Sequence, residues 1–198
     1  MENLYFVTTS IRKFISLNGS FSKFGLSIEQ KNIELQEIQS YDVEYVASNK
    51  AMHAFSMLKK PCIVQDSGFY IKSLNDFPGA LVKPILSCIG IEGLLKLAEN
   101  KDRECEFIEC FAYIDKNIKK PICFEQRVKG NLSVKQQGTL KDKYWSSLYQ
   151  IFIPFGLNKT IAEMSLEEHK KWNEYSSHEY EINLAKYLKK LNSSKFME

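Results

Sequence analysis

The stretch PCIVQDSGFYIKSLNDFPGALVK, residues 61–83, decides how the rest of the chain is interpreted. Residues 61–64 form a short apolar run of the kind that fills the buried strands of a sheet. Asp66 follows almost at once, and a Phe-Pro-Gly turn and Lys83 come further on. Because packing alone does not require a carboxylate at the end of an apolar strand, the stretch predicts a buried strand that delivers Asp66 to a site.

Apolar spacing on both sides of this stretch predicts alternating strands and helices. Such alternation, with a hairpin inserted, indicates an α/β fold. Ser165 and Glu168 match a capping box and predict the start of a further helix. The expected strands are residues 4–7, 33–38, 105–115 and 122–128, and the expected helices are residues 11–19, 43–59, 85–97 and 181–191.

Composition is that of an ordinary soluble globular protein, with 44% apolar and 26% charged residues in 198. The net charge of +3 is too small to indicate a nucleic-acid or membrane partner, and neither is expected. No apolar run reaches the roughly 18 residues of a spanning helix, and no signal peptide is recognised. Five cysteines without a CxxC pair favour reduced thiols over a metal site at Cys105 and Cys110, and predict a cytoplasmic protein.

Acids and bases gather where strands are expected to end. Glu37 and Asp66 each follow an apolar segment, and Lys13 and Lys50 are placed to face the same region. Carboxylates and lysines around one site suit a magnesium-bound polyphosphate, because hard cations take carboxylate and phosphate oxygens together. The alternative is a set of solvated charges. The Thr8-Thr9-Ser10 turn is open to two similar interpretations, a helix N-cap or an anion site.

Five stretches match motifs of one known family, in the family's order. LYFVTTSIRKF (4–14) is similar to a phosphate loop T-G-N-x-x-K. IELQEIQSYDVEYVASNKA (33–51) is similar to a D-L-x-E-I-Q segment, and VQDSGFYIKSLNDFPG (64–79) to V-(D/E)-D-(S/T)-G-L. IFIPFGLNKTIAEMSLEE (151–168) resembles I-F-x-P-x-G-x-x-x-T-x-A-E-M, and Ser177-His178 resembles S-H-R. With these motifs the chain resembles the inosine triphosphate pyrophosphatase family (HAM1-like enzymes), whose members hydrolyse non-standard purine nucleoside triphosphates.

The resemblance implies a single domain over residues 1–198, with two lobes around a central cleft and a mixed β-sheet flanked by helices. It implies Mg²⁺-dependent hydrolysis of a nucleoside triphosphate, ribose or deoxyribose, to the monophosphate and pyrophosphate. It also implies that the protein forms a homodimer and binds a nucleoside triphosphate as its substrate.

Site residues carry over position by position. Asp66 would orient or deprotonate water and contact the metal, Glu37 would be a metal ligand, and Gln65 a weak one. The residues implied to bind phosphate or nucleotide are Thr8, Ser10, Lys13, Lys50, Ser67, Gly68, Lys83, Ser177, His178 and Glu179.

Departures from the family pattern concentrate on the base side. Ser10 replaces an asparagine, and Gln65 replaces an acid, which should weaken metal binding. Leu148 and Tyr149 stand where the family carries a stacking aromatic and an aspartate of its base pocket. Glu179 replaces the arginine of S-H-R. A carboxylate accepts hydrogen bonds where arginine donates them, so it should repel a purine 6-keto oxygen and favour an amino group.

Three functions therefore stay open. The first is a nucleoside triphosphate pyrophosphatase with altered base preference. The second is a catalytically impaired family member that serves as a nucleotide-binding or protein-interaction module. The third is an enzyme for another phosphorylated substrate, such as a modified nucleotide with an amino group.

Overall fold

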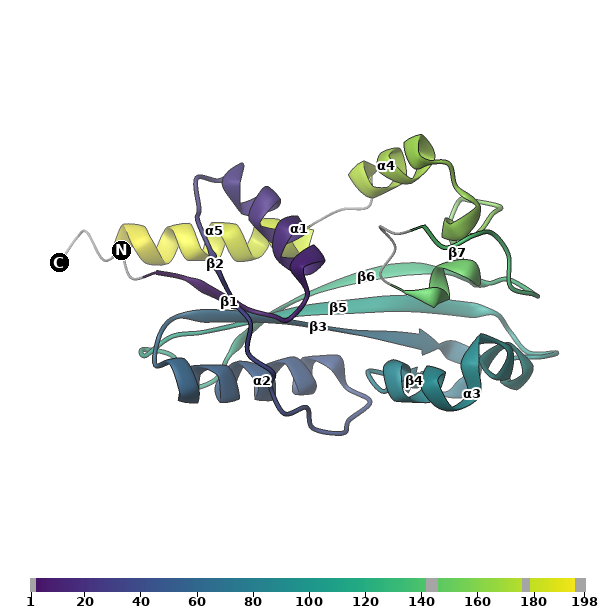
Figure 1. Cartoon of the computed structure of the whole chain (residues 1–198), viewed down its shortest axis with the longest axis horizontal. Helices are drawn as coiled ribbons and strands as arrows, with labels where there is room; N and C mark the ends of the chain where they lie inside the picture. The colour runs from purple at the N-terminus through teal and green to yellow at the C-terminus, as the bar shows by residue number, and fades with distance from the viewer. Residues whose placement is uncertain (1–2, 142–145, 176–178, 195–198) are drawn as a thin grey trace. The chain divides into compact units, whose positions relative to one another are not determined.

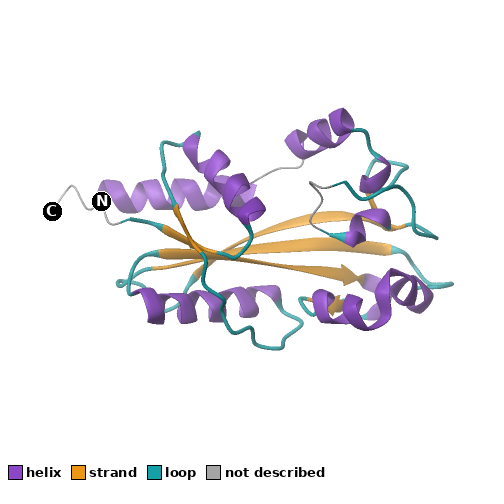
Figure 2. Ribbon diagram, in the orientation of Figure 1, coloured by secondary structure: helices purple, strands orange, loops and turns teal. Residues whose placement is uncertain are grey.

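The computed structural model describes residues 3–141, 146–175 and 179–194 (Figures 1 and 2). The strands are β1 (Tyr5–Val7), β2 (Glu29–Lys31), β3 (Cys62–Ile71), β4 (Phe77–Gly79), β5 (Glu104–Ile114), β6 (Ile122–Leu132) and β7 (Phe152–Pro154). The α-helices are α1 (Ile11–Ser22), α2 (Val43–Leu58), α3 (Val82–Leu97), α4 (Leu166–Tyr175) and α5 (Glu179–Ser194). Short 3₁₀ turns cover Lys72–Leu74, Ser147–Gln150 and Ile161–Glu163.

The strands form one open, mixed sheet in the order β2-β1-β3-β5-β6-β7, with β4 paired to β3. β1 is parallel to both β2 and β3, while β4 and β7 pair antiparallel with β3 and β6. Parallel neighbours need a crossover, and α1 and α2 supply the crossovers into β2 and β3. The expected α/β fold with a mixed, helix-flanked sheet is confirmed.

β1 is much shorter than its neighbour β3. It pairs with β3 only at Tyr5–Cys62 and Phe6–Ile63, and it ends at Val7. The predicted strand end at Asp66 is wrong, because β3 continues to Ile71. Asp66 lies instead just past the point where β1 stops. Asp66 therefore lies near the end of the neighbouring strand, not at the end of its own.

The strand expected at residues 33–38 is also absent, since these residues have no regular structure. The ladder with β1 is made earlier, by Glu29–Lys31. Ile33, Leu35 and Ile38 are nevertheless half-buried and their neighbours exposed. The alternation in the sequence therefore comes from an irregular segment that packs one side against the protein. Periodicity alone does not distinguish such a segment from a strand.

Side chains cap the helices near the site. Ser10 is the N-cap of α1 and accepts a hydrogen bond from the Lys13 backbone N–H (3.3 Å). Asp42 caps α2 by accepting from the backbone N–H groups of Glu44 and Tyr45. At α4 the capping box of Ser165 and Glu168 is confirmed by reciprocal bonds of 2.8 and 3.1 Å.

The chain divides into two compact units, the first made of residues 1–66, 109–126 and 178–198 and the second of residues 67–108 and 127–177. In the first unit, α1 and α5 lie on one side of the strands and α2 on the other (Figure 2). Phe6, Leu17, Phe111 and Leu184, from two strands and two helices, share its core. The prediction of a single domain with a central cleft stays a prediction.

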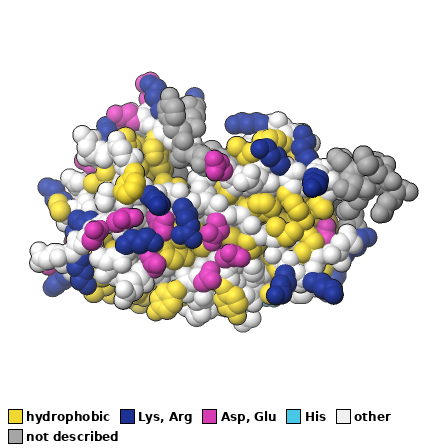
Figure 3. Space-filling model, turned by 180° about the vertical axis from the view of Figure 1, so that it is seen from behind, with side chains coloured by type: hydrophobic (Ala, Val, Ile, Leu, Met, Phe, Trp, Pro, Cys, Tyr) yellow, Lys and Arg dark blue, Asp and Glu magenta, His cyan; other side chains and the backbone are white. Residues whose placement is uncertain are grey.

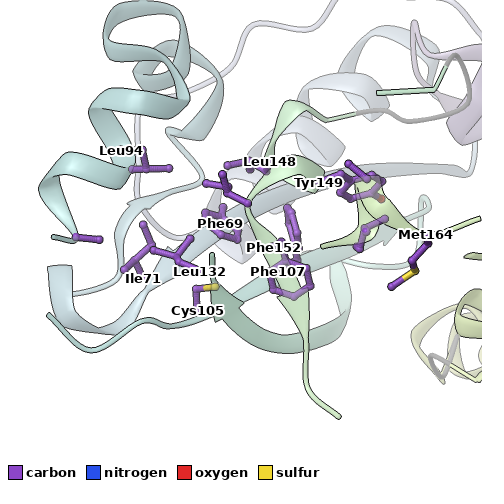
Figure 4. Close-up of a cluster of buried hydrophobic side chains, with 14 residues drawn as sticks. Phe69, Ile71, Leu94, Cys105, Phe107, Leu132, Leu148, Tyr149, Phe152 and Met164 are labelled. Atoms are coloured by element: carbon purple, nitrogen blue, oxygen red, sulfur yellow. The ribbon is translucent and has the colours of Figure 1, made fainter. Parts of the chain in front are cut away.

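The core of the second unit is built around aromatic side chains (Figure 4). The Phe107 ring centroid lies 4.8 Å from those of both Phe69 and Phe152, within the range of favourable aromatic pairs. Leu148 and Tyr149 belong to the same core, with exposed fractions of 1% and 7%. Both side chains therefore have a packing role, whatever further role they have.

The surface carries both signs of charge. Figure 3 shows Lys and Arg side chains interspersed with Asp and Glu on one face, in keeping with the net charge of +3. Within residues 3–141, 146–175 and 179–194, none of the helices combines the length and the apolar character needed to cross a membrane.

Gly68 is fixed by the close approach of β3 and β4. A Cβ at this position would lie 2.6 Å from Tyr70 Cε2 and 2.9 Å from the Ala80 nitrogen. We expect Gly68→Ala to lower the free energy of unfolding by about 1–3 kcal/mol, measured by urea denaturation.

The matched control is Gly19→Ala within α1, where a Cβ meets no heavy atom within 4 Å. There alanine should be neutral or stabilise by up to ~1 kcal/mol. Equal unfolding midpoints for the two variants would contradict the close approach at Gly68.

Candidate functional site

The phosphate loop predicted from the sequence is a tight turn between β1 and α1. The Ser10 backbone N–H donates to Thr8 Oγ1 (3.1 Å), and the Lys13 backbone N–H donates to Ser10 Oγ. Two hydroxyl groups therefore fold the turn, so the N-cap interpretation is confirmed for Ser10. The capped turn also places Lys13 in the first turn of α1, where the helix dipole favours anions.

Lys50 brings two of the predicted acids together. Its Nζ lies 2.7 Å from Glu37 Oε1 and 2.9 Å from Asp66 Oδ2. The Lys50 and Asp66 side chains are 14% and 15% exposed, whereas Glu37 is 56% exposed. Helix α2, strand β3 and the irregular segment after β2 thus meet at one ammonium group.

The pKa of Lys50 reflects this pairing. Burial lowers the pKa, but the charges of Asp66 and Glu37 and the hydrogen bonds to them outweigh burial, so the pKa lies above its ordinary value of 10.5. The ion pairs therefore stabilise the fold fully below about pH 10.5. That contribution is lost as the pH rises through the higher pKa of the folded state.

The pKa of Lys13 shifts in the opposite direction, below its ordinary value. Burial of the ammonium group lowers the pKa, and the charges of Asp66 and Glu109 offset this only in part. Among the described residues, no carboxylate oxygen lies within 4.0 Å of the Lys13 ammonium. An added anion, such as a phosphate, would replace lost hydration and raise the pKa again.

Glu109 is a site residue that the sequence analysis missed. It lies on β5 and accepts hydrogen bonds from Tyr180 Oη (2.6 Å) and Gln65 Nε2 (3.3 Å). The signal was available, because Glu109 interrupts an apolar strand just as Asp66 does. Glu106 on the same strand has an ordinary explanation, since Lys72 and Arg127 pair with it at 2.8 and 3.1 Å.

The other predicted residues lie elsewhere or are not described. Lys83 is exposed on α3, and Ser67 and Gly68 continue β3 after Asp66. Glu179 is exposed as the first residue of α5. Ser177 and His178 lie outside the described residues.

The donor set fits magnesium in a particular way. Within the described parts of the chain, no three His, Cys, Asp or Glu side chains gather as a metal cage. Magnesium is ordinarily held by one or two carboxylates together with substrate phosphates and water. Glu37 and Asp66, which converge on Lys50, supply such a pair, so these residues fit a metal that arrives with a polyphosphate.

Replacement of Lys50 by methionine leaves Glu37 and Asp66 without their shared cation, which should destabilise the fold. With Asp66 largely buried and its cation gone, we expect Lys50→Met to destabilise the fold by about 2–4 kcal/mol at pH 7. The difference from the wild type should shrink as the pH rises above the ordinary lysine pKa of 10.5. Urea denaturation across pH 7–11 measures both.

Lys171→Met is the matched control, because its pair with Glu167 (2.9 Å) is exposed at 64% and 78%. Its effect should stay below about 0.5 kcal/mol. A loss of similar size in both variants would show that Lys50 is an ordinary surface cation.

Solved structures share this fold. The chain matches a HAM1 protein from Coxiella burnetii with a TM-score of 0.76 at 22% identity, covering 96% of this chain and all of that one. It matches a nucleoside-triphosphatase / dITP/XTP pyrophosphatase from Mycobacterium abscessus with a TM-score of 0.73 at 22% identity, covering 88% and 94%.

Sequence relatives extend the likeness. A dITP/XTP pyrophosphatase of Saccharolobus solfataricus is 36% identical over 168 residues, 84% of each chain. One of Ignicoccus hospitalis is 32% identical over 189 residues, 94% of this chain and 97% of that one. The Ham1 family model matches residues 4–191. With the fold, the ordered motifs and these relatives in agreement, the chain belongs to the Ham1 family.

Proposed function

We propose that this protein hydrolyses a purine nucleoside triphosphate to the monophosphate and pyrophosphate, with magnesium bound alongside the substrate. The observation that carries the proposal is the Lys50 ammonium between Glu37 and Asp66, with Lys13 beside them. Relatives named as dITP/XTP pyrophosphatases support the reaction type.

The chain's own residues divide the work. Lys13 has an ammonium that no carboxylate of the described residues pairs within 4.0 Å, so it binds a phosphate oxygen of the substrate. Asp66 orients a water molecule and takes its proton as the water oxygen attacks the α-phosphorus. The bond between the α-phosphorus and the bridging oxygen breaks, and pyrophosphate leaves. Glu37 and Asp66 would hold magnesium, which would neutralise phosphate charge when bound.

Asp66→Asn tests the proposed role directly. The amide keeps an oxygen for Lys50 but cannot take a proton, so pyrophosphate release from dITP should fall at least about 100-fold. The assay is run with magnesium and with chelator, and chelator should abolish the wild-type reaction.

Asp76→Asn is the matched control. Asp76 is exposed, pairs with Lys72 at 3.0 Å and has a positive φ of 63° that asparagine tolerates. It should retain wild-type turnover. An Asp66→Asn variant as active as this control would end the proposal.

Base preference is proposed to differ from that of the dITP/XTP relatives. Glu179 begins α5 and is exposed, so its carboxylate is free of the core and able to meet a ligand. An acceptor there should favour a base with an amino group over one with a keto oxygen.

Glu179→Arg should therefore raise kcat/KM for dITP relative to dATP by roughly tenfold, the equivalent of about 1.4 kcal/mol. The measurement is pyrophosphate release from both nucleotides by both proteins. An unchanged ratio would remove Glu179 from base selection.

The second candidate is a catalytically impaired member that binds a nucleotide or a protein. Gln65 favours it, since the family pattern has an acid there and the amide nitrogen is committed to Glu109. A folded wild type that releases no pyrophosphate from inosine, xanthosine, guanosine, adenosine or cytidine triphosphate would support this candidate.

A further inference from the structure

Gln65, Glu109 and Tyr180 form a three-residue hydrogen-bond network that takes no part in the hydrolysis step proposed for Asp66. Gln65 precedes Asp66 on β3, Glu109 lies on the neighbouring strand β5, and Tyr180 lies in the first turn of α5. Tyr180 Oη donates to Glu109 Oε2 at 2.6 Å, and Gln65 Nε2 lies 3.3 Å from the same oxygen. One carboxylate thus joins three elements of the first unit.

The network fixes the orientation of the Gln65 side chain. A carboxylate oxygen only accepts hydrogen bonds, so the amide must turn its nitrogen toward Glu109. Its carbonyl oxygen is then directed away from Glu109. Tyr180 is itself held, because its ring is 4% exposed and stacks on Phe111 with centroids 4.8 Å apart. Glu109 therefore accepts from Tyr180, which is held by its packing, and orients the Gln65 side chain.

Glu109 also contributes charge to the site. Its negative charge, with those of Asp66 and Glu37, acts on Lys13, while Lys50 adds a second cation. In the motif that resembles residues 64–68, the position of Gln65 carries an acid. This chain has lost a carboxylate on β3, and it holds one within hydrogen-bond distance of the same side chain on β5.

We propose that Glu109 takes the place of the acid missing at position 65, as a positioning residue that orients the Gln65 side chain and keeps a negative charge near Lys13. This inference rests on the proposed pyrophosphatase function and deepens it. The carboxylate is needed on this side of β3, and either strand can carry it.

The geometry makes an exchange of the two side chains possible. Tyr180 Oη lies 3.5 Å from Gln65 Nε2 as well as 2.6 Å from Glu109, so the phenol reaches both positions. In the double variant Gln65→Glu with Glu109→Gln, the new carboxylate can accept from Tyr180 and from the new amide. The network is then inverted with every hydrogen bond kept.

The experiment compares the wild type, both single variants and the double variant in magnesium-dependent pyrophosphate release from dITP and dATP. Partners that orient a catalytic group are typically worth 10–100-fold, so Glu109→Gln should lower kcat by about tenfold. KM should change by less than about threefold, because Lys13 still holds the phosphate. The double variant should regain kcat to within about threefold of the wild type.

Gln65→Glu alone places two carboxylates against each other, and their repulsion should lower the thermal unfolding midpoint. Glu104→Gln, the same chemical change at the first residue of β5, is the control and should leave kcat unchanged. Calorimetric binding of pyrophosphate with magnesium, which needs no turnover, should differ by less than about threefold among all variants.

Three results would overturn the inference: full activity in Glu109→Gln, a double variant as impaired as Glu109→Gln alone, or a Gln65→Glu variant as stable and active as the wild type. In each case the proposed function still stands if the wild type releases pyrophosphate. A wild type that releases no pyrophosphate from either nucleotide sinks the proposed function, and this inference with it.

Discussion

The ion pairs of Lys50 are the interaction on which the rest of the site depends. Removing an ammonium and a carboxylate from water is costly, and the cost is recovered only when partners are close and correctly oriented. Lys50 meets that condition twice, at 2.7 and 2.9 Å. Because α2 is capped by Asp42 and packed through its alanine-rich side, the ammonium is presented from a rigid element.

The short β1 strand explains why this site exists at all. In a sheet of equal strands, β1 would continue alongside Asp66, and the turn into α1 would begin farther along. Here β1 makes two pairs with β3 and then turns at Thr8. The turn starts α1 beside the part of β3 that β1 does not pair with, so Lys13 and Asp66 come within electrostatic range of each other. In other α/β sheets, ligands bind beyond the carboxyl end of a strand. Here the early end of β1 gives Asp66, in the middle of β3, a comparable position.

Most of the fold could be predicted from the sequence because strand and helix periods are local. The strand from Cys62, the helix over residues 43–58, the long strand pair and the Ser165 cap all follow from such patterns. The absent strand at 33–38 could not, because half-burial of Ile33 and Leu35 produces the same alternation without a ladder partner.

The site was predictable to the extent that its residues interrupt apolar runs or match an ordered motif. Glu37, Lys50 and Asp66 were found in this way, and the structure brings them together. Glu109 also interrupts an apolar strand, but its partners Gln65 and Tyr180 are 44 and 71 residues away in sequence, so the sequence alone did not connect it with the other acids. Only the pairing of β3 with β5 and the docking of α5 make it part of the site.

The two lysines carry different tasks, and their environments show which is which. Lys50 is paired with two carboxylates, its pKa is raised, and its charge is committed to holding Glu37 and Asp66. Lys13 is desolvated, its pKa is lowered, and the nearby acids compensate only in part. A cation that is under-compensated in the folded protein gains most from an arriving anion, because binding restores what burial removed. We therefore propose that phosphate recognition is strongest at Lys13, and that Lys50 sets the position of the carboxylate proposed to act on the substrate.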